Sequence, residues 1–292
     1  MRILLFLATN LAVLVLVSVI FNLQGLEGIP ANNGVDLNLI SLLILCGMFG
    51  ISGSQISLLL SKFMAKRGTG TQLIETPRNR KEQWLLDTVK SPADDARIGM
   101  PKVGIFPSDA ANAVATGTRN NALVAVSSGL LRRFEEREAR AVLAHEIGHV
   151  ANGDMITLSL VQGVVNTFVM FFARIIGHTA DRVVFKTERG YGIGYFVVTI
   201  VAEIALGILA SVIVMWFSRY REYRADAAGA RLADREGMIA ALQRLKAKQG
   251  LPGDLPGELS SFGIRSATGS GLATLLRSHP PLDDRIFALL NA

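Results

Sequence analysis

The stretch AHEIGHV at residues 144–150 decides how the rest of this chain is interpreted. It contains an HExxH pattern, in which His145 and His149 are four positions apart. On a helix such residues share a face, so both imidazoles can bind one metal ion. Glu146 lies beside the first histidine, where it can contact a metal-bound water and act as a general base. The pattern therefore predicts a helix that supplies two ligands of a hydrolytic zinc site.

The residues on either side of the motif place it in water or at a membrane surface. Residues 135–140 are highly charged, and apolar residues recur at helical spacing as far as Val150. We therefore expect a helix from about 135 to 152. An HExxH motif buried in the bilayer would lie inside an apolar run, whereas this motif precedes the run that begins at Ile156.

Four apolar runs predict four transmembrane helices, because each is close to the roughly 20 residues that cross a bilayer. Half of the 292 residues are apolar and the mean hydropathy is +0.38, which is high for an ordinary soluble domain. The first run follows Arg2 and could be a cleaved signal peptide, but its long core and the lack of an A-x-A site favour a retained anchor. The runs are residues 3–23, 37–60, 156–173 and 193–217, of which the third is the shortest.

The net charge of +6 does not suggest nucleic-acid binding, because the distribution of the basic residues instead indicates how the chain is oriented in a membrane. Lys and Arg are concentrated in the polar stretches 62–154 and 218–292, and the connector 24–36 has none. By the positive-inside rule the two polar stretches face the cytoplasm of a multi-pass inner-membrane protein. The connector 178–192 should face outward yet carries basic residues, which would be less surprising if the third and fourth runs only dip into the membrane.

The polar stretches predict an α+β fold that is mainly helical with a small β-sheet. We expect strands at 103–106, 112–116 and 122–126, with a turn at 117–121. We also expect a helix over 82–89 that Ser91-Pro92 ends, a short helix over 129–133 capped by Ser127-Ser128, a helical segment over 218–248, a loop over 249–271 and a last helix over 282–290. Residues 1–61 then hold two transmembrane helices, 62–154 and 218–292 form the two parts of a cytoplasmic catalytic domain, and 155–217 form a membrane hairpin.

A third zinc ligand is expected directly after the hairpin. Because the hairpin returns the chain to the side that it left, the first polar residues after it can meet the HExxH helix. Glu222 and Asp226 lie there at positions i and i+4, on one helical face. Glu222 can bind the metal, and Asp226 can accept a hydrogen bond from a ligand histidine. Four flanking arginines leave a solvated, salt-bridged helix as the alternative, which the neighbouring HExxH motif makes less favoured.

Two polar residues inside the apolar runs need partners. Glu203 in the fourth run and Asn166 in the third are at similar depths if the runs form an antiparallel hairpin. Because polar groups in the bilayer are costly when unpaired, we expect these two to face each other or a wet cavity.

Together these features resemble the HtpX family of bacterial membrane-bound zinc metalloproteases, which are related to the CAAX prenyl proteases. The resemblance covers the four apolar runs and four motifs, residues 112–117, 145–149, 218–230 and 278–286. It implies a gluzincin-type catalytic domain that faces the cytoplasm, binds one Zn²⁺, and degrades damaged or misfolded membrane proteins or unfolded polypeptides.

The resemblance also implies roles for residues outside the zinc ligands. His279 and Arg285 match a C-terminal His-Pro…Arg pattern and are candidates to stabilise the oxyanion, although a capped turn with a salt bridge would explain them as well. The segment Asn112, Ala113, Val114, Ala115 and Thr116 matches an edge strand that could bind an extended substrate through its main chain. Two alternatives remain open: a selective processing protease for a prenylated or signal-like substrate, and a non-catalytic membrane zinc-binding scaffold.

Overall fold

The structure is a computed structural model that describes residues 38–188, 190–247 and 278–292. These residues form two compact units. The first comprises the described residues before Leu58 together with Ser159–Val214, and the second comprises Leu58–Leu158 with the described part of Met215–Ala292. The predicted first apolar run and the predicted loop over 249–271 lie outside the described residues.

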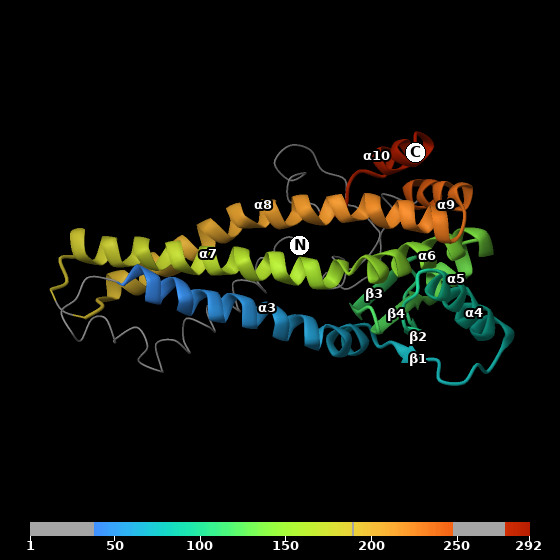
Figure 1. Cartoon of the computed structure of the whole chain (residues 1–292), viewed down its shortest axis with the longest axis horizontal. Helices are drawn as coiled ribbons and strands as arrows, with labels where there is room; N and C mark the ends of the chain where they lie inside the picture. Colours follow the sequence, from blue (N-terminus) through green and yellow to red (C-terminus); the bar gives the residue numbers. More distant parts are fainter. Residues whose placement is uncertain (1–37, 189, 248–277) are drawn as a thin grey trace. The chain divides into compact units, whose positions relative to one another are not determined.

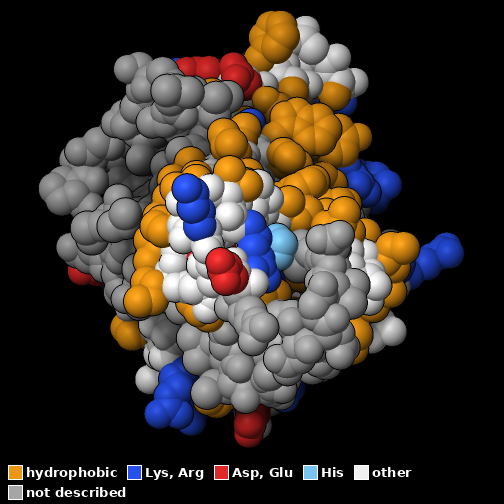
Figure 2. Space-filling view, turned by 90° about the vertical axis from the view of Figure 1, so that its left-hand side faces the viewer, with side chains coloured by type: hydrophobic (Ala, Val, Ile, Leu, Met, Phe, Trp, Pro, Cys, Tyr) orange, Lys and Arg blue, Asp and Glu red, His pale blue; other side chains and the backbone are white. Residues whose placement is uncertain are grey.

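Three helices in the described part are long and apolar enough to cross a membrane, judged by length and composition. They are α3 (Leu39–Thr69), α7 (Asp154–Val183) and α8 (Ile193–Leu232). Large hydrophobic side chains on all three are exposed, and Ile193 is 83% exposed. Figure 2 shows, in the described part of one end of the molecule, hydrophobic side chains around a central group of Lys or Arg, acidic and His side chains. Such surfaces are costly in water, so these helices fit insertion in a membrane.

In the first unit, α7 and α8 share a buried ion pair rather than the predicted contact between Glu203 and Asn166. Glu203 Oε1 lies 3.1 Å from Arg174 Nη1, and both side chains are buried. Asn166 instead accepts a hydrogen bond from Gln162 on its own helix, at 2.9 Å. The predicted contact between the two residues was wrong, and their facing a wet cavity stays a prediction. Arg174 directly follows the apolar run and was not counted in it, although α7 continues through it for two more turns.

The second unit contains a four-stranded mixed sheet in the order β1-β2-β4-β3. The strands are β1 (Gln72–Leu73), β2 (Lys102–Phe106), β3 (Ala113–Thr118) and β4 (Asn121–Ser127). β2 runs parallel to β4, and β3 pairs with β4 in an antiparallel hairpin. The strands predicted from sequence are confirmed within two residues. β3 is an edge strand of the sheet in the described part of the chain.

Five helices complete the second unit around one hydrophobic core (Figure 1). They are α4 (Arg80–Asp95), α5 (Ser128–Arg133), α6 (Glu136–Asn152), α9 (Arg235–Ala247) and α10 (Leu282–Leu290). Helix α6 packs against β3, β4, α4 and α9, so the HExxH helix is at the centre of this unit. The core includes Leu85 and Val89 of α4, Leu143 and Ile147 of α6, and Leu242 of α9.

The predicted end of the α4 helix was wrong. Helix α4 continues through Pro92 to Asp95, although Ser91-Pro92 was expected to end it. Proline removes one backbone hydrogen bond but is tolerated when packing holds the turn. Here Pro92 and Ala93 are buried with Val89 on the core side of the helix, which stabilises the last turn.

Candidate metal centre

The HExxH helix has well-defined ends. At its start the Glu135 backbone N–H donates to the Glu138 carboxylate at 2.9 Å. At its end Gly153 adopts a left-handed conformation with φ of 70°, and its N–H donates to the Val150 carbonyl at 3.1 Å. A residue with a side chain rarely adopts this φ, so glycine is suited to the sharp change of direction. The turn places Asp154, the first residue of α7, beside the end of α6.

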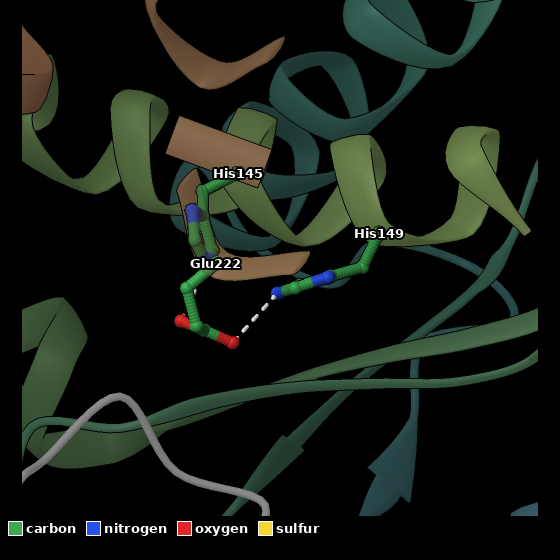
Figure 3. A group of neighbouring side chains, drawn as sticks. All are labelled: His145, His149 and Glu222. Carbon is green, nitrogen blue, oxygen red and sulfur yellow. Dashed lines mark ion pairs between the residues drawn. The ribbon is translucent and has the colours of Figure 1, made fainter. Parts of the chain in front are cut away.

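The three predicted ligands converge in the second unit. His145 and His149 extend from α6 toward the Glu222 carboxylate on α8, as Figure 3 shows. His145 Nε2 lies 3.7 Å from Glu222 Oε2, and His149 Nε2 lies 3.4 Å from Glu222 Oε1. One ligand atom from each residue can be chosen so that all lie within 4.8 Å of one another. This spacing fits three ligands around one metal ion, since each zinc bond is about 2.0–2.2 Å long.

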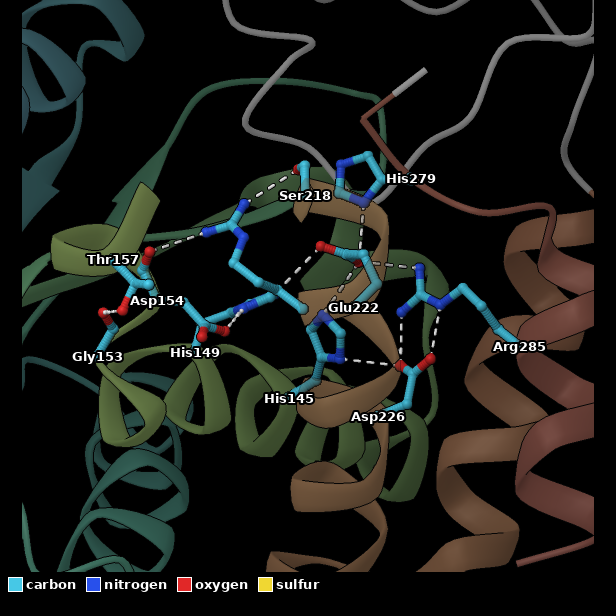
Figure 4. A network of polar contacts seen from close by, with 11 residues as sticks. His145, His149, Gly153, Asp154, Thr157, Ser218, Glu222, Asp226, His279 and Arg285 are labelled. Atoms are coloured by element: carbon cyan, nitrogen blue, oxygen red, sulfur yellow. Dashed lines mark hydrogen bonds and ion pairs between the residues drawn. The ribbon is translucent and has the colours of Figure 1, made fainter. Parts of the chain in front are cut away.

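Each ligand histidine has a carboxylate behind it (Figure 4). His145 Nδ1 lies 3.0 Å from Asp226 Oδ1, as the i, i+4 spacing from Glu222 predicted. His149 Nδ1 lies 2.7 Å from Asp154 Oδ2, a contact that the sequence reading missed. Both contacts leave the Nε2 atoms facing Glu222, which is the arrangement expected when Nδ1 donates a proton to a carboxylate and Nε2 binds metal.

His279 and Arg285 also reach this cluster, from the C-terminal segment. Arg285 is fully buried and donates to both Asp226 oxygens, at 2.7 and 2.6 Å, with Nη1 3.3 Å from Glu222 Oε2. His279 Nδ1 lies 2.8 Å from Glu222 Oε2. The predicted general base, Glu146, is buried on α6. The structure therefore brings every residue predicted for the metal centre into one cluster, in which all but the partly exposed His279 are buried.

The buried carboxylates of the cluster outnumber its guanidinium groups, which favours a bound cation or proton. Four carboxylates are buried here, those of Glu146, Asp154, Glu222 and Asp226. Two guanidinium groups oppose them, from Arg285 and from Arg221, which is also buried. With neutral imidazoles the cluster has an excess of two negative charges, and buried charges are strongly unfavourable unless paired or bound to metal. One divalent cation would neutralise this excess.

The pKa shifts in the cluster have the same origin. Burial alone would lower the pKa of His149, but hydrogen bonds to Asp154 and Glu222 raise it to about 10. Burial raises the pKa of Glu146, against the opposing effect of the two histidines. For Asp226 burial acts upward, and the Arg285 guanidinium outweighs it and lowers the pKa to about 2. The field that favours a proton on His149 would equally attract a metal cation.

Two glycines allow α6 and α8 to approach closely enough for this geometry. A Cβ atom on Gly148 would lie 2.7 Å from the Ala228 Cβ, and one on Gly229 would lie 3.2 Å from the His145 backbone nitrogen. Gly148 precedes His149 in the chain, and Gly229 faces the backbone of His145. Side chains at these two positions would therefore push the segments that carry the ligands apart.

The comparison with known proteins agrees with this site. The family described as Peptidase family M48 matches residues 79–292, which include every residue of the cluster. The chain belongs to this family. It is therefore a metalloprotease, a hydrolase whose substrates are polypeptides.

Relatives in the family match almost the whole chain. The "Protease HtpX" of Pseudomonas putida (strain GB-1) is 65% identical over 290 residues, which are 99% of this chain and 98% of the relative. Those of Pseudomonas entomophila (strain L48) and Pseudomonas syringae pv. tomato (strain ATCC BAA-871 / DC3000) are 64% and 63% identical, with the same coverage. The resemblance inferred from the sequence is confirmed.

A solved structure shows that the fold is shared more widely. The "Crystal Structure of S. mikatae Ste24p" matches with a TM-score of 0.63 at 18% identity, over 97% of this chain and 66% of that longer chain. The fold is therefore shared with a protein of low sequence identity.

Proposed function

We propose that the peptidase is a zinc metalloendopeptidase in which His145, His149 and Glu222 hold the metal. The observation that carries this proposal is the convergence of the three buried ligands, with one ligand atom from each lying within 4.8 Å of the others. Two imidazoles and one carboxylate are a ligand set that zinc favours in hydrolases. When bound, zinc supplies a water ligand with a pKa of about 7 and polarises the scissile carbonyl.

Glu146 is the proposed proton carrier. It takes a proton from the attacking water and delivers it to the leaving amine. Its carboxylate is buried, and in the described part of the chain no hydrogen bond or ion pair ties it to a neighbour. A base with no fixed partner can move between the water and the amine. Asp226 favours the tautomer of His145 that carries its proton on Nδ1, because an Asp226 oxygen lies beside that atom. Nε2 is then left to bind the metal.

Of the two oxyanion candidates, His279 has the better-placed donor. Neither of its ring nitrogens has a hydrogen-bond partner among the residues that the structure describes, but Nδ1 lies 2.8 Å from Glu222 Oε2, which leaves Nε2 for the substrate. Arg285 already directs three of its nitrogen atoms toward the Asp226 and Glu222 carboxylates. We therefore assign stabilisation of the oxyanion to His279, and we assign to Arg285 the role of holding the Asp226 and Glu222 carboxylates in place.

The substrate would add to the sheet at the edge of β3. The Ser127 N–H donates to the Asn112 carbonyl, so the main chain of Asn112 faces β4. Because hydrogen bonding alternates along an antiparallel pair, Val114 and Thr116 also face β4, and the main-chain groups of Ala113 and Ala115 point away from β4. No strand in the described part of the chain pairs with that side of β3, although both alanines are buried in the structure. The alanine side chains belong to the hydrophobic core. The strand thus offers main-chain groups rather than side chains, which suits substrates of many sequences.

The membrane setting favours a role in protein quality control. Apolar helices embed the peptidase in a membrane, and a strand that reads main chain can accept any unfolded segment near it. We assign the protein to the bacterial inner membrane with its catalytic domain in the cytoplasm, since Lys and Arg are concentrated in the segments that build that domain. Damaged or misfolded membrane proteins are then the expected substrates.

Metal analysis combined with cleavage assays tests the proposal. Purified protein in detergent should contain one zinc per chain and cleave a casein-type substrate, and Glu146→Gln should keep the zinc but lose cleavage. Retained cleavage in this variant would remove Glu146 as the base, and zinc without any cleavage in the wild type would indicate a scaffold. Peptide inhibitors methylated at successive backbone nitrogens should lose affinity at every second position, because only alternate residues pair with β3.

A further inference from the structure

Asp154 holds one of the two metal-binding histidines in a way that the HExxH pattern does not specify. Its Oδ2 lies 2.7 Å from His149 Nδ1, and both side chains are buried. Asp154 lies five residues after His149, beyond the end of α6. The helical spacing that aligns the two histidines therefore does not create this contact. It depends on the left-handed turn at Gly153, which directs the chain back toward the end of the helix.

Asp154 is itself tied to the helix that carries the third ligand. The Nη1 atom of Arg221 donates to the Asp154 carbonyl oxygen at 3.2 Å, and Nη2 donates to Ser218 Oγ at 3.1 Å. Arg221 directly precedes Glu222 in α8 and is buried. The contacts thus connect His149 through Asp154 to Arg221, the residue that precedes Glu222 in α8. Figure 4 shows His149, Asp154 and Ser218 in this network.

We propose that Asp154 is a positioning residue for the metal, which fixes the His149 ring with Nε2 toward Glu222, and that Arg221 keeps Asp154 in place. The inference rests on the proposed zinc site and deepens it. An imidazole with a free Nδ1 can rotate and exchange its tautomer, whereas a carboxylate on Nδ1 fixes both and raises the basicity of Nε2. His145 has Asp226 for this purpose, so each ligand histidine has its own carboxylate.

A purely structural role for Asp154 makes a different prediction. Asp154 is the first residue of α7, where a negative charge stabilises the positive end of the helix dipole. If this were its only role, removing the charge would lower the thermal stability of the metal-free protein and leave metal affinity unchanged. If Asp154 positions His149, metal affinity falls, whether or not the metal-free protein also loses stability.

The test measures both quantities on the full-length protein in detergent. After metal removal, Zn²⁺ affinity is determined by competition with a chelator, and thermal unfolding is followed without metal. Asp154→Ala should weaken Zn²⁺ binding roughly 10- to 100-fold, and Asp154→Asn, which keeps an oxygen acceptor, should weaken it less. The asparagine variant alone carries the test if the alanine variant does not fold.

Glu138→Gln is the matched control, because Glu138 is a buried carboxylate at the other end of the same helix, where it pairs with Arg244. This control should lose thermal stability and keep wild-type Zn²⁺ affinity. Wild-type affinity in both Asp154 variants would overturn the inference, as would lowered metal-free stability with unchanged affinity. Absence of Zn²⁺ binding by the wild-type protein would instead refute the proposed function.

Discussion

Substitution of Gly148 by alanine tests whether the close approach of α6 and α8 sets the metal geometry. The new Cβ would lie 2.7 Å from the Ala228 Cβ and 3.3 Å from the Ala225 carbonyl oxygen. Two carbon atoms in contact prefer a separation of about 3.5–4.0 Å, so the two helices must separate locally by about 1 Å. Gly148 is adjacent to His149, and Ala225 is adjacent to Asp226, so the displacement occurs at the site itself.

The displacement is large compared with what a metal site tolerates. Metal–ligand distances are held to about 0.2 Å, and a shift of about 1 Å therefore removes or weakens one ligand. We expect Zn²⁺ affinity to fall at least about tenfold, which corresponds to about 1.4 kcal/mol. The net change in global stability should be about 0–2 kcal/mol, because overpacking costs about 1–3 kcal/mol and alanine is favoured over glycine in a helix by about 1 kcal/mol.

The assay combines chelator competition for Zn²⁺, casein cleavage and thermal unfolding. Gly207→Ala is the matched control, because Gly207 is also inside a long helix but a Cβ there would meet nothing within 4 Å. A second change, Ala228→Gly, removes the atom that clashes and should restore part of the affinity to Gly148→Ala. Wild-type Zn²⁺ affinity and cleavage in the Gly148→Ala protein would refute the reasoning.

Three further predictions concern the buried charges and the metal. Arg285→Met should lower the free energy of unfolding by about 3–5 kcal/mol, since it leaves the Asp226 carboxylate buried without its partner. Arg285→Lys should recover only part of this free energy, because lysine lacks the planar fork of the guanidinium. Thermal unfolding of Arg285→Met that matches the wild type would contradict the pairing of Arg285 with Asp226. Arg174→Met alone or Glu203→Gln alone should destabilise the protein in detergent more than the double variant, because each single change leaves one buried group uncompensated. If the losses in melting temperature of the two single variants add up in the double variant, Arg174 and Glu203 do not depend on each other. Chelation should abolish cleavage and lower the melting temperature, and added Zn²⁺ should restore both, because a ligand that binds the folded state stabilises it; a chelated protein that still cleaves casein would exclude a metal requirement.

Much of the site could be predicted because its main parts follow local rules. The two histidines and Glu146 lie within five residues of one helix, and helix geometry places them together in any fold. Glu222 is more than seventy residues away, yet it could be found because a hairpin of two apolar helices must return the chain to its starting side. The i, i+4 spacing then placed Asp226 on the same face.

Other parts could not be predicted because they depend on how separate segments meet. The partner of Glu203 is Arg174 rather than Asn166, and this choice is set by the register and rotation of α7 against α8. Asn166 and Arg174 are about two turns apart on α7, so the register of α7 against α8 decides which of them Glu203 meets. The continuation of α4 through Pro92 is likewise a result of packing, which outweighs the local preference of proline.

The order of residues along this chain is thus sufficient to specify the ligand set, the apolar helices and the kind of chemistry, because these depend on helical periodicity and on the length of a bilayer-spanning segment. The contacts that complete the centre arise only in the folded chain. Asp154 faces His149 because Gly153 adopts a left-handed turn, and Arg285 reaches Asp226 because α10 packs against α9. Such contacts join residues from different elements, and their distances are fixed by core packing that no single segment encodes.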